Sequence, residues 1–195
     1  MEIILVRHGE TELNHQKKYC GWKDPSLTET GICQAEIVRD KLKAENLQAI
    51  YCSDLKRTFE TAQIINEYHQ LGIVPMKGLR EMNFGLLDGL SYAEIQKKYP
   101  TEAQLWEKDW IDFVLPQGES FRSMYERVNE TVREIYKESK KDKILFVSHS
   151  GCIRAILAHW IGGTMKDYWK YKIEHCGITR IEISDDYSIL SALNQ

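Results

Sequence analysis

The chain has 195 residues, with 29 acidic and 26 basic side chains, and its formal net charge at pH 7 is -3. This length suits one domain with a continuous core, so we predict a single domain over residues 1–195. The small negative excess argues against a nucleic-acid partner or an anionic membrane surface. No apolar run approaches the ~18 residues that a membrane span needs, and the N-terminal apolar stretch stops at Arg7, unlike a signal peptide.

The five cysteines include no CxxC pair, and their odd number favours free thiols in a reducing compartment. We therefore expect a cytoplasmic protein. His149 with Cys152, and His175 with Cys176, are isolated pairs that lack the spacing of a zinc site. We expect neither a metal nor another cofactor.

Hydrophobic periodicity predicts alternating strands and helices along the chain. In order, we predict strand 3–6, helix 27–46, strand 48–52, helix 55–68, strand 73–76, two short helices opening near 91 and 101, helix 118–140, strand 143–147, helix 152–161, and a hairpin of strands 178–183 and 187–193 around Asp185 and Asp186. This alternation indicates an α/β fold, specifically a three-layer α/β/α sandwich with a mostly parallel central sheet. The hairpin is expected to add one antiparallel strand.

Side-chain patterns define the inner faces and the starts of these helices. The expected inner positions are Ile32, Ala35, Val38 and Leu42 in the first helix and Phe121, Met124, Val128, Val132 and Ile135 in the long one. Ser53 and Asp54 are expected to cap the second helix, and Ser91 and Thr101 to open capping boxes. Residues 84–116 form a predicted helical cap inserted after the third strand, with Trp106 and Trp110 on its second helix.

Polar residues follow each predicted parallel strand. Arg7 and His8 end the first, Arg57 lies one helical turn after the second, Glu81 follows the third, and His149 follows the fourth. Because parallel strands share one direction, these side chains are expected to meet at the same rim of the sheet. Two forked guanidinium groups favour a compact dianion, and phosphate fits them.

A histidine inside such a cluster either donates a hydrogen bond to phosphate or attacks phosphorus. The neighbouring cations lower its pKa and keep it neutral near pH 7. A carboxylate that faces a dianion is suited to carry a proton to the leaving oxygen, and Glu81 is the candidate. Glu10, Glu29 and Asp88 also fall near the rim, so a structural role for Glu81 stays open.

Five ordered motifs resemble the histidine phosphatase superfamily, which includes the cofactor-dependent phosphoglycerate mutases. They are Arg7-His8-Gly9-Glu10-Thr11 with Asn14, Leu27-Thr28-Glu29-Thr30-Gly31, Ser53-Asp54-Leu55-Lys56-Arg57-Thr58, Leu79-Arg80-Glu81 and Ser148-His149-Ser150-Gly151, and the similarity spans residues 1 to about 160. The resemblance implies a metal-independent phosphomonoester hydrolase in which His8 forms a phosphohistidine, His149, Arg7 and Arg57 hold the phosphoryl oxygens, and Glu81 moves the proton. It also implies substrate contacts at Asn14, Cys20 and Gly21. Ser150, just before the predicted helix 152–161, is expected to bind the substrate as well, because free backbone N–H groups at a helix start bind anions.

The short chain and its stretch 21–25 resemble the phosphatases of this family more than its mutases, which are longer and have His-Tyr-Gly after the matching glutamate, where this chain has Met82-Asn83-Phe84. The stretches 79–89 and 116–120 are most similar to alpha-ribazole phosphatases, whose substrate is a 5'-phosphorylated riboside with an aromatic base. Trp106 and Trp110 then either stack on that base or pack within the cap.

The alternatives are a broad-specificity phosphatase of sugars or other small metabolites, a phosphoglycerate mutase, and a phosphoester-binding module without turnover. The expected partner is a small phosphorylated metabolite, and the chain is expected to be a monomer or a homodimer. At His175-Cys176-Gly177 the chain departs from related chains, which more often have a small polar residue there, and no function is assigned to it.

Overall fold

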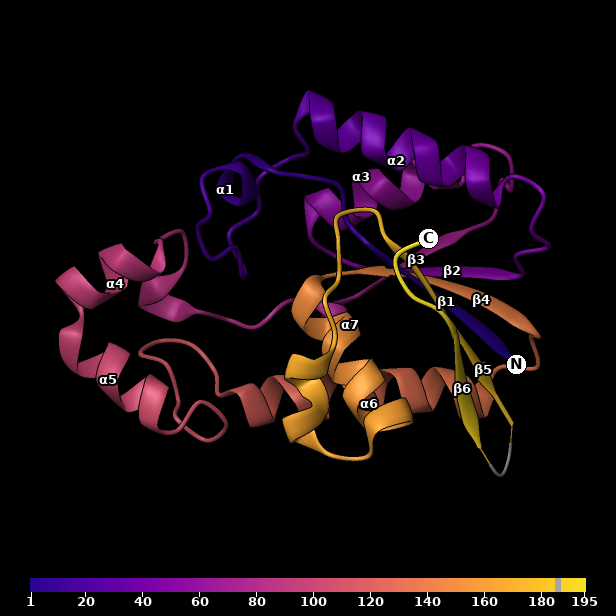
Figure 1. The fold of residues 1–195 in the computed structure, drawn as a ribbon. Helices are drawn as coiled ribbons and strands as arrows, with labels where there is room; N and C mark the ends of the chain where they lie inside the picture. Colours follow the sequence, from indigo (N-terminus) through magenta and orange to yellow (C-terminus); the bar gives the residue numbers. More distant parts are fainter. Residues whose placement is uncertain (185–186) are drawn as a thin grey trace.

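Six strands form one mixed sheet in the computed structural model, which describes residues 1–184 and 187–195 (Figure 1). Their order across the sheet is β3 (Ile73–Met76), β2 (Ala49–Ser53), β4 (Lys143–Ser148), β1 (Glu2–Arg7), β5 (Ile178–Ile183) and β6 (Ser188–Ala192). The first four run parallel, β5 pairs antiparallel with β1, and β6 pairs antiparallel with β5. Both hairpin strands therefore join the sheet, where one antiparallel strand was expected. The turn predicted at Asp185 and Asp186 lies outside the described residues.

Helices cover both faces of the sheet. They are α1 (Glu12–His15), α2 (Glu29–Leu42), α3 (Lys56–Ile65), α4 (Tyr92–Lys98), α5 (Pro100–Lys108), α6 (Phe121–Glu138) and α7 (Ser150–Leu157), with a π-helical turn (Ala158–Gly162) and 3-10 turns (Lys77–Leu79, Gly85–Leu87, Met165–Lys170). In β1, Ile3 and Leu5 pack in the core under α6 and α7, whereas Ile4 and Val6 pack under α2 and α3 (Figure 1). The alternation confirms the predicted three-layer α/β/α sandwich.

The inner face of α2 differs from the prediction by one residue. Gly31 is buried, whereas Ile32 is 42% exposed. A Cβ at Gly31 would collide with the backbone of Glu10, so α2 lies directly against the chain that leaves β1. This close approach sets the rotation of the helix and turns Ile32 outward. The apolar face of α6 is as predicted, since all five of its expected inner residues are buried.

Two predicted helix caps are wrong. α3 begins after Leu55, which makes no side-chain cap, and Asp54 instead forms an ion pair with Arg80. α5 begins at Pro100 rather than after a Thr101 cap, because proline is favoured in the first helical turn. The capping box at Ser91 is present at the start of α4 as predicted.

The segment 84–116 carries α4 and α5 and lies on the side of the sheet where the parallel strands end (Figure 1). Its two ends are held together, because the Glu119 N–H donates to the Asn83 carbonyl (3.0 Å) and the Asn83 N–H donates to the Glu119 carboxylate (2.8 Å). Over residues 1–184 and 187–195, no helix is long and apolar enough to span a bilayer.

Candidate active site

The ends of the parallel strands bring the polar residues named above to one rim. Arg7 and His8 follow from β1, Arg57 lies in the first turn of α3, and His149 immediately precedes α7. His8, Arg57, Glu81 and His149 are all buried, and the Arg57 side chain has no exposed surface. Charged groups in such a place require close polar partners, and the structure supplies them.

The His8 ring is held in one protonation state. Its Nδ1 lies 2.7 Å from the Gly9 carbonyl oxygen, which can only accept, so Nδ1 carries the proton. Its Nε2 accepts a hydrogen bond from Arg57 Nε at 3.3 Å. Burial, and then the charges of Arg57 and Arg7, lower the pKa of His8 well below its ordinary value. His8 is therefore neutral near pH 7, with its lone pair on Nε2.

Arg57 is fixed by the backbone of the loop that follows α1. Its guanidinium donates to the carbonyls of Lys23 (2.9 Å), Gly21 (2.8 Å) and Cys20 (3.3 Å). The substrate contacts predicted at Cys20 and Gly21 stay predictions, and the structure shows that the carbonyls of both residues bind this arginine. The Gly21 N–H donates to Asp88, and burial raises the pKa of the Cys20 thiol.

His149 accepts a hydrogen bond from Arg57 at Nδ1, at 3.1 Å. Because arginine only donates, the neutral ring carries its proton on Nε2. Burial, followed by the charge of Arg57, lowers the pKa of His149 well below its ordinary value. The His149 Nε2 atom is buried and has no hydrogen-bond partner among the described residues, so it is a donor available to a ligand.

Arg7 is oriented by the loop before β5. Its NH1 donates to the Ile173 carbonyl at 2.8 Å, and its NH2 lies 2.7 Å from His175 Nε2. Its Nε is a second buried donor without a partner in the described part of the chain. Burial lowers the pKa of Arg7 to about 10, which leaves the guanidinium charged at neutral pH. Sequence reasoning assigned no role to His175, and its only signal was the departure from related chains.

Glu81 is anchored at both carboxylate oxygens. The Met82 and Gly151 N–H groups each donate to it at 2.9 Å. A Cβ at Gly151 would collide with the Glu81 carboxylate, so the first turn of α7 approaches this group as closely as its backbone permits. Glu81 also lines the pocket described below.

The other carboxylates near the rim hold the local structure. Asp88 accepts hydrogen bonds from the Gly21 and Lys23 N–H groups, each at 2.8 Å. Glu10 accepts a hydrogen bond from the Thr28 hydroxyl at 3.1 Å. Glu29 is exposed on α2. Of the four carboxylates near the rim, Glu81 is the one that lines the pocket.

Asn14 makes hydrogen bonds within its own segment of the chain, whereas Ser150 lies at the pocket. The Asn14 side-chain oxygen accepts from the Thr11 N–H (3.1 Å) and hydroxyl (2.8 Å), so it caps α1. Ser150 is the first residue of α7 and lines the pocket together with Gly151. No group of three or more His, Cys, Asp or Glu residues in 1–184 and 187–195 is arranged to hold a metal ion.

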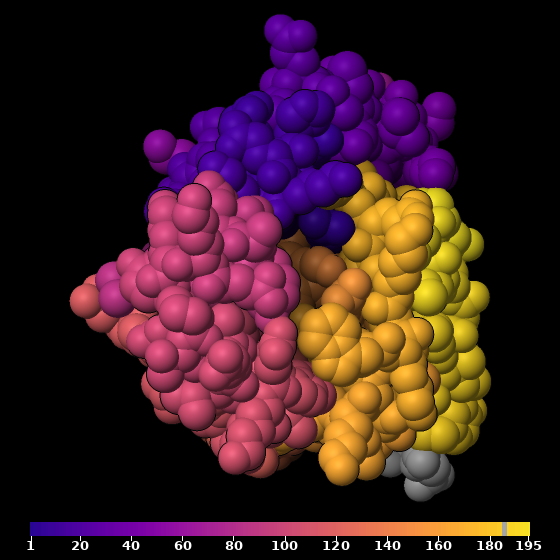
Figure 2. Space-filling view, turned by 60° about the vertical axis from the view of Figure 1, so that its left-hand side comes forward, coloured from indigo at the N-terminus to yellow at the C-terminus, as the bar shows by residue number. Residues whose placement is uncertain are grey.

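A pocket of about 310 Å³ opens beside Glu81. It lies between the N-terminal segment, the segment with α4 and α5, and the C-terminal helices, where Figure 2 shows a hollow. Its wall is mostly aromatic and is formed by Tyr19, Phe84, Tyr92, Trp106, Trp110, Phe121, Tyr168 and Trp169. Trp106 lies on α5 as predicted, but α5 ends at Lys108 and Trp110 lies beyond it.

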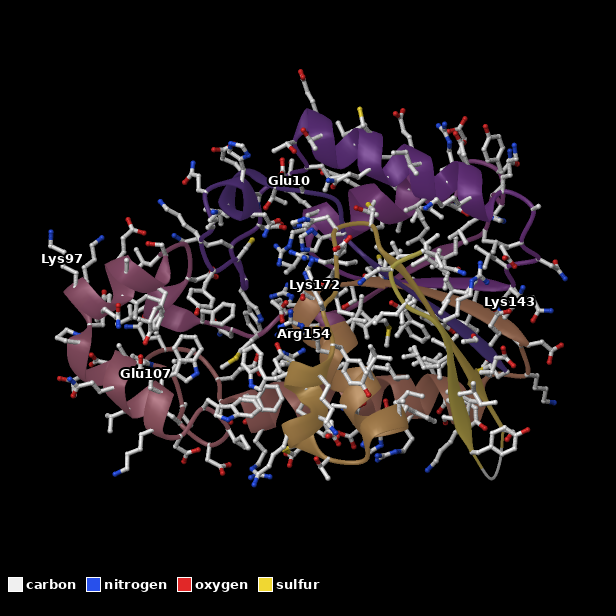
Figure 3. The ribbon with its side chains drawn as sticks, in the orientation of Figure 1. Glu10, Lys97, Glu107, Lys143, Arg154 and Lys172 are labelled. Atoms are coloured by element: carbon white, nitrogen blue, oxygen red, sulfur yellow. The ribbon has the colours of Figure 1, made fainter. Side chains whose placement is uncertain are left out.

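Arg154 is a cation near this wall that sequence reasoning missed (Figure 3). Its guanidinium carbon lies 5.5 Å from the Tyr168 ring centre and 5.6 Å from that of Trp169, and its Nε is buried without a partner in the described structure. Arg154 lies four residues after Ser150, on the same face of α7. That spacing is the signal that predicts its position beside the pocket.

A profile of the histidine phosphatase superfamily (branch 1) matches residues 3–195. The chain belongs to this superfamily. Among similar members, phosphoserine phosphatase 1 of Hydrogenobacter thermophilus is 30% identical over 100% of this chain and 92% of its own. The adenosylcobalamin/alpha-ribazole phosphatase of Escherichia coli is 27% identical over 100% and 96%. The crystal structure of the alpha-ribazole phosphatase of Shigella flexneri, also 27% identical, superposes with a TM-score of 0.95 and the same coverages.

The family expected from the five motifs is thus confirmed, and the chain is a phosphatase. The match of the histidine phosphatase superfamily extends past residue 160, where the motif resemblance ended, to the last residue of the chain. It therefore includes the loop that orients Arg7 and the wall formed by Tyr168 and Trp169.

Proposed function

We propose that this phosphatase hydrolyses small phosphomonoesters through a covalent phosphohistidine on His8, without a metal. The observation that carries the proposal is the state of His8. The ring is buried and neutral, its proton is fixed on Nδ1 by the Gly9 carbonyl, and its Nε2 lone pair lies beside Arg57. A neutral imidazole with a fixed tautomer is a competent nucleophile at pH 7.

In the first step, the phosphate dianion binds at the unpartnered Arg7 Nε and His149 Nε2 donors and beside the Arg57 guanidinium. His8 Nε2 attacks phosphorus, the N–P bond forms, and the ester P–O bond breaks in line with it. A proton on Glu81 passes to the leaving oxygen, so the product alcohol departs neutral. The Gly9 carbonyl stabilises the positive charge that develops on the imidazole.

In the second step, water replaces the alcohol. The Glu81 carboxylate takes one proton from the water as its oxygen attacks phosphorus, and the N–P bond breaks. This step regenerates neutral His8, releases inorganic phosphate and restores the proton on Glu81. The two backbone donors on Glu81, from Met82 and Gly151, keep the carboxylate in one position through both steps.

For the leaving group, we favour a riboside with an aromatic base, as in alpha-ribazole 5'-phosphate. The aromatic wall beside Glu81 supports this choice, because flat bases gain stacking contacts with such rings. Trp106 and Trp110 both line the pocket and also pack against neighbouring aromatic rings, so the stacking and packing roles are compatible. The relatives from Escherichia coli and Shigella flexneri support the same choice.

A second candidate is a phosphorylated hydroxy or amino acid, such as phosphoserine. Arg154 favours this candidate, because its buried Nε is an available donor for a substrate carboxylate next to Tyr168 and Trp169. The relative from Hydrogenobacter thermophilus supports it as well. Three other possibilities are broad specificity toward sugar phosphates, mutase activity, and a binding module without turnover. Each of them predicts a different result in the comparison of substrates described below.

The test is a comparison of kcat/KM for alpha-ribazole 5'-phosphate, phosphoserine, fructose bisphosphates, nucleotides, 3-phosphoglycerate and p-nitrophenyl phosphate, with EDTA present. We expect alpha-ribazole 5'-phosphate to exceed phosphoserine by about 100-fold, and Trp110→Ala to remove most of that advantage. Similar values for both substrates would refute the aromatic preference. A preference for phosphoserine that Arg154→Gln abolishes would establish the second candidate.

The covalent intermediate has its own test. Radiolabelled substrate should leave acid-labile, base-stable phosphate on the wild-type chain after rapid quenching, and His8→Asn should leave none. His159→Asn is the matched control, because His159 contacts Tyr125 and Arg133 away from the rim. Labelling that persists in folded His8→Asn would refute the proposed nucleophile, and absence of both labelling and turnover in the wild type would favour a binding module.

A further inference from the structure

We infer that His175 is a positioning residue that orients Arg7 for phosphate binding. This inference rests on the proposed role of Arg7 in holding the phosphoryl group. It concerns the loop between the turn Met165–Lys170 and β5, where sequence analysis assigned no function.

The loop holds Arg7 at three points. The Ile173 carbonyl accepts from NH1 at 2.8 Å, His175 Nε2 lies 2.7 Å from NH2, and the Cys176 N–H donates to the Arg7 carbonyl at 3.0 Å. The terminal guanidinium nitrogens are thus engaged on the side of the loop, and the buried Nε is left without a partner among the described residues. His175 is the member of the trio that contacts Arg7 through its side chain.

The chemical type of His175 suits this task. Because Arg7 only donates, His175 Nε2 must accept, and the ring is neutral with its proton on Nδ1. Burial, and then the charge of Arg7, lower the pKa of His175 to about 4. A carboxylate in this position would also accept the hydrogen bond, but it would neutralise the positive charge that attracts phosphate. A neutral imidazole fixes the guanidinium and leaves its charge intact.

The backbone of the loop is anchored independently of His175. The Asn194 side chain accepts from the Glu174 N–H at 3.0 Å and donates to the Lys172 carbonyl at 2.7 Å. The Gly177 N–H donates to the Glu174 carbonyl at 3.1 Å, which closes a turn. Because these contacts do not involve the imidazole, a substitution at His175 removes one contact to Arg7 and leaves the loop in place.

His175 lies close to the nucleophile His8, so a change at His175 is expected to affect the site where phosphate binds. Its ring centre lies 6.0 Å from that of His8, and the pKa of His8 is lowered in part by Arg7. A guanidinium that rotates away from its place would present its Nε donor in a different direction from the one required for phosphate. The expected consequence is weaker phosphate binding, with a smaller effect on the chemical step.

The experiment compares five variants, three at His175 and one each at His159 and Arg7, by the inhibition constant of inorganic phosphate and by kcat and KM for p-nitrophenyl phosphate. His175→Leu and His175→Asn, which lack an acceptor at the Nε2 position, are expected to raise the phosphate inhibition constant and KM about 10-fold and to change kcat less than threefold. His175→Gln places an amide oxygen near the Nε2 position and is expected to restore binding to within about threefold of wild type. The matched control is His159→Leu, which removes the contact of the same kind that His159 Nε2 makes with Arg133 NH2 (3.1 Å) and should change neither constant.

Unchanged phosphate inhibition in folded His175→Leu and His175→Asn would overturn the inference, and so would a His175→Gln variant as impaired as His175→Leu. Arg7→Gln separates this failure from failure of the proposed function. If Arg7→Gln leaves phosphate inhibition unchanged, the proposed role of Arg7 is wrong. If Arg7→Gln weakens inhibition and the His175 variants do not, only the positioning role is wrong. Thermal unfolding of each variant identifies any loss caused by misfolding.

Discussion

Replacing Glu81 with glutamine tests the proposed proton carrier most directly. Glu81→Gln keeps the size of the side chain and removes its ability to donate and accept the catalytic proton. Proton transfer by a positioned side chain contributes roughly 10²- to 10⁴-fold to a rate, so we expect kcat for an alkyl phosphate to fall by that factor. An alkoxide is a poor leaving group, and without a proton it departs slowly.

The structure also predicts the cost of this substitution to stability. Both Glu81 oxygens accept from backbone N–H groups, of Met82 and Gly151, each at 2.9 Å. A glutamine offers one oxygen and one NH₂ group, so one of these N–H groups must face another donor. A buried donor left unsatisfied costs about 1–3 kcal/mol. For a chain of this size the expected decrease in Tm is roughly 2–12 °C, which calorimetry resolves.

The assay exploits the difference between leaving groups. Phosphorylation of His8 by p-nitrophenyl phosphate needs no proton donor, because p-nitrophenolate leaves readily. Glu81→Gln should therefore release a rapid burst of about one p-nitrophenolate per chain, followed by slow turnover, since hydrolysis of the phosphohistidine still needs the missing base. Alkyl phosphates should show no burst. Glu107→Gln, at an exposed carboxylate of the pocket, is the matched control.

One result would show that Glu81 does not protonate the leaving group. If Glu81→Gln slowed the single-turnover phosphorylation of His8 equally for the aryl and alkyl substrates, the loss would not depend on leaving-group protonation. Glu81 would then act only by holding the first turn of α7, as its contact with Gly151 permits.

Arg57, Gly151 and the buried histidines offer three other tests of the site. In Arg57→Lys, one ammonium nitrogen cannot occupy both the NH1 position beside the Lys23 carbonyl and the NH2 position beside the Cys20 and Gly21 carbonyls. The free energy of unfolding in urea should therefore fall by about 2–4 kcal/mol, and an unchanged value would contradict the importance of those bonds. Gly151→Ala should displace the Glu81 carboxylate and lower kcat about 100-fold, and wild-type turnover in this variant would show that its position is not critical. Folding lowers the pKa values of His8 and His149, so proton binding favours the unfolded chain. The stabilisation is complete above about pH 6.5, the ordinary histidine pKa, and is lost as the pH falls below that value. The free energy of unfolding should then decrease by up to about 1.4 kcal/mol per pH unit for each histidine. His8→Asn should reduce this slope in urea titrations at pH 5 to 7, and an unchanged slope would show that His8 does not contribute.

The sequence alone predicts the sheet and the meeting of Arg7, His8, Arg57 and His149 at one rim. These predictions depend on local signals: apolar runs mark the strands, and polar residues at strand ends share a rim because the strands are parallel. The rotation of α2 about its own axis could not be predicted in the same way. It depends on a close backbone approach at Gly31, whereas hydrophobic periodicity places the larger Ile32 on the inner face.

The contacts made through backbone groups could not be predicted from the sequence either. The carbonyls of Cys20 and Gly21 hold Arg57, although nothing in the chemistry of a cysteine or a glycine distinguishes their carbonyls from any others. His175 is distant from Arg7 in sequence and lies in a loop without periodicity. Its role depends on a long-range approach that only the folded chain defines.

The junction between Asn83 and Glu119 has a consequence for how substrate preference can change. Two hydrogen bonds join these residues, so the intervening segment leaves the scaffold and returns to it at nearly one point. Because the entropy of closing a loop grows slowly with its length, longer or shorter segments can be exchanged at this junction with little effect on folding. The side chains around His8 lie outside the exchanged part, and Asp88 is the member of that part that holds the loop of Gly21 and Lys23 beside Arg57. A chimera that carries residues 84–118 of a relative with Asp88 retained should therefore keep the same phosphate chemistry and acquire a different leaving-group preference.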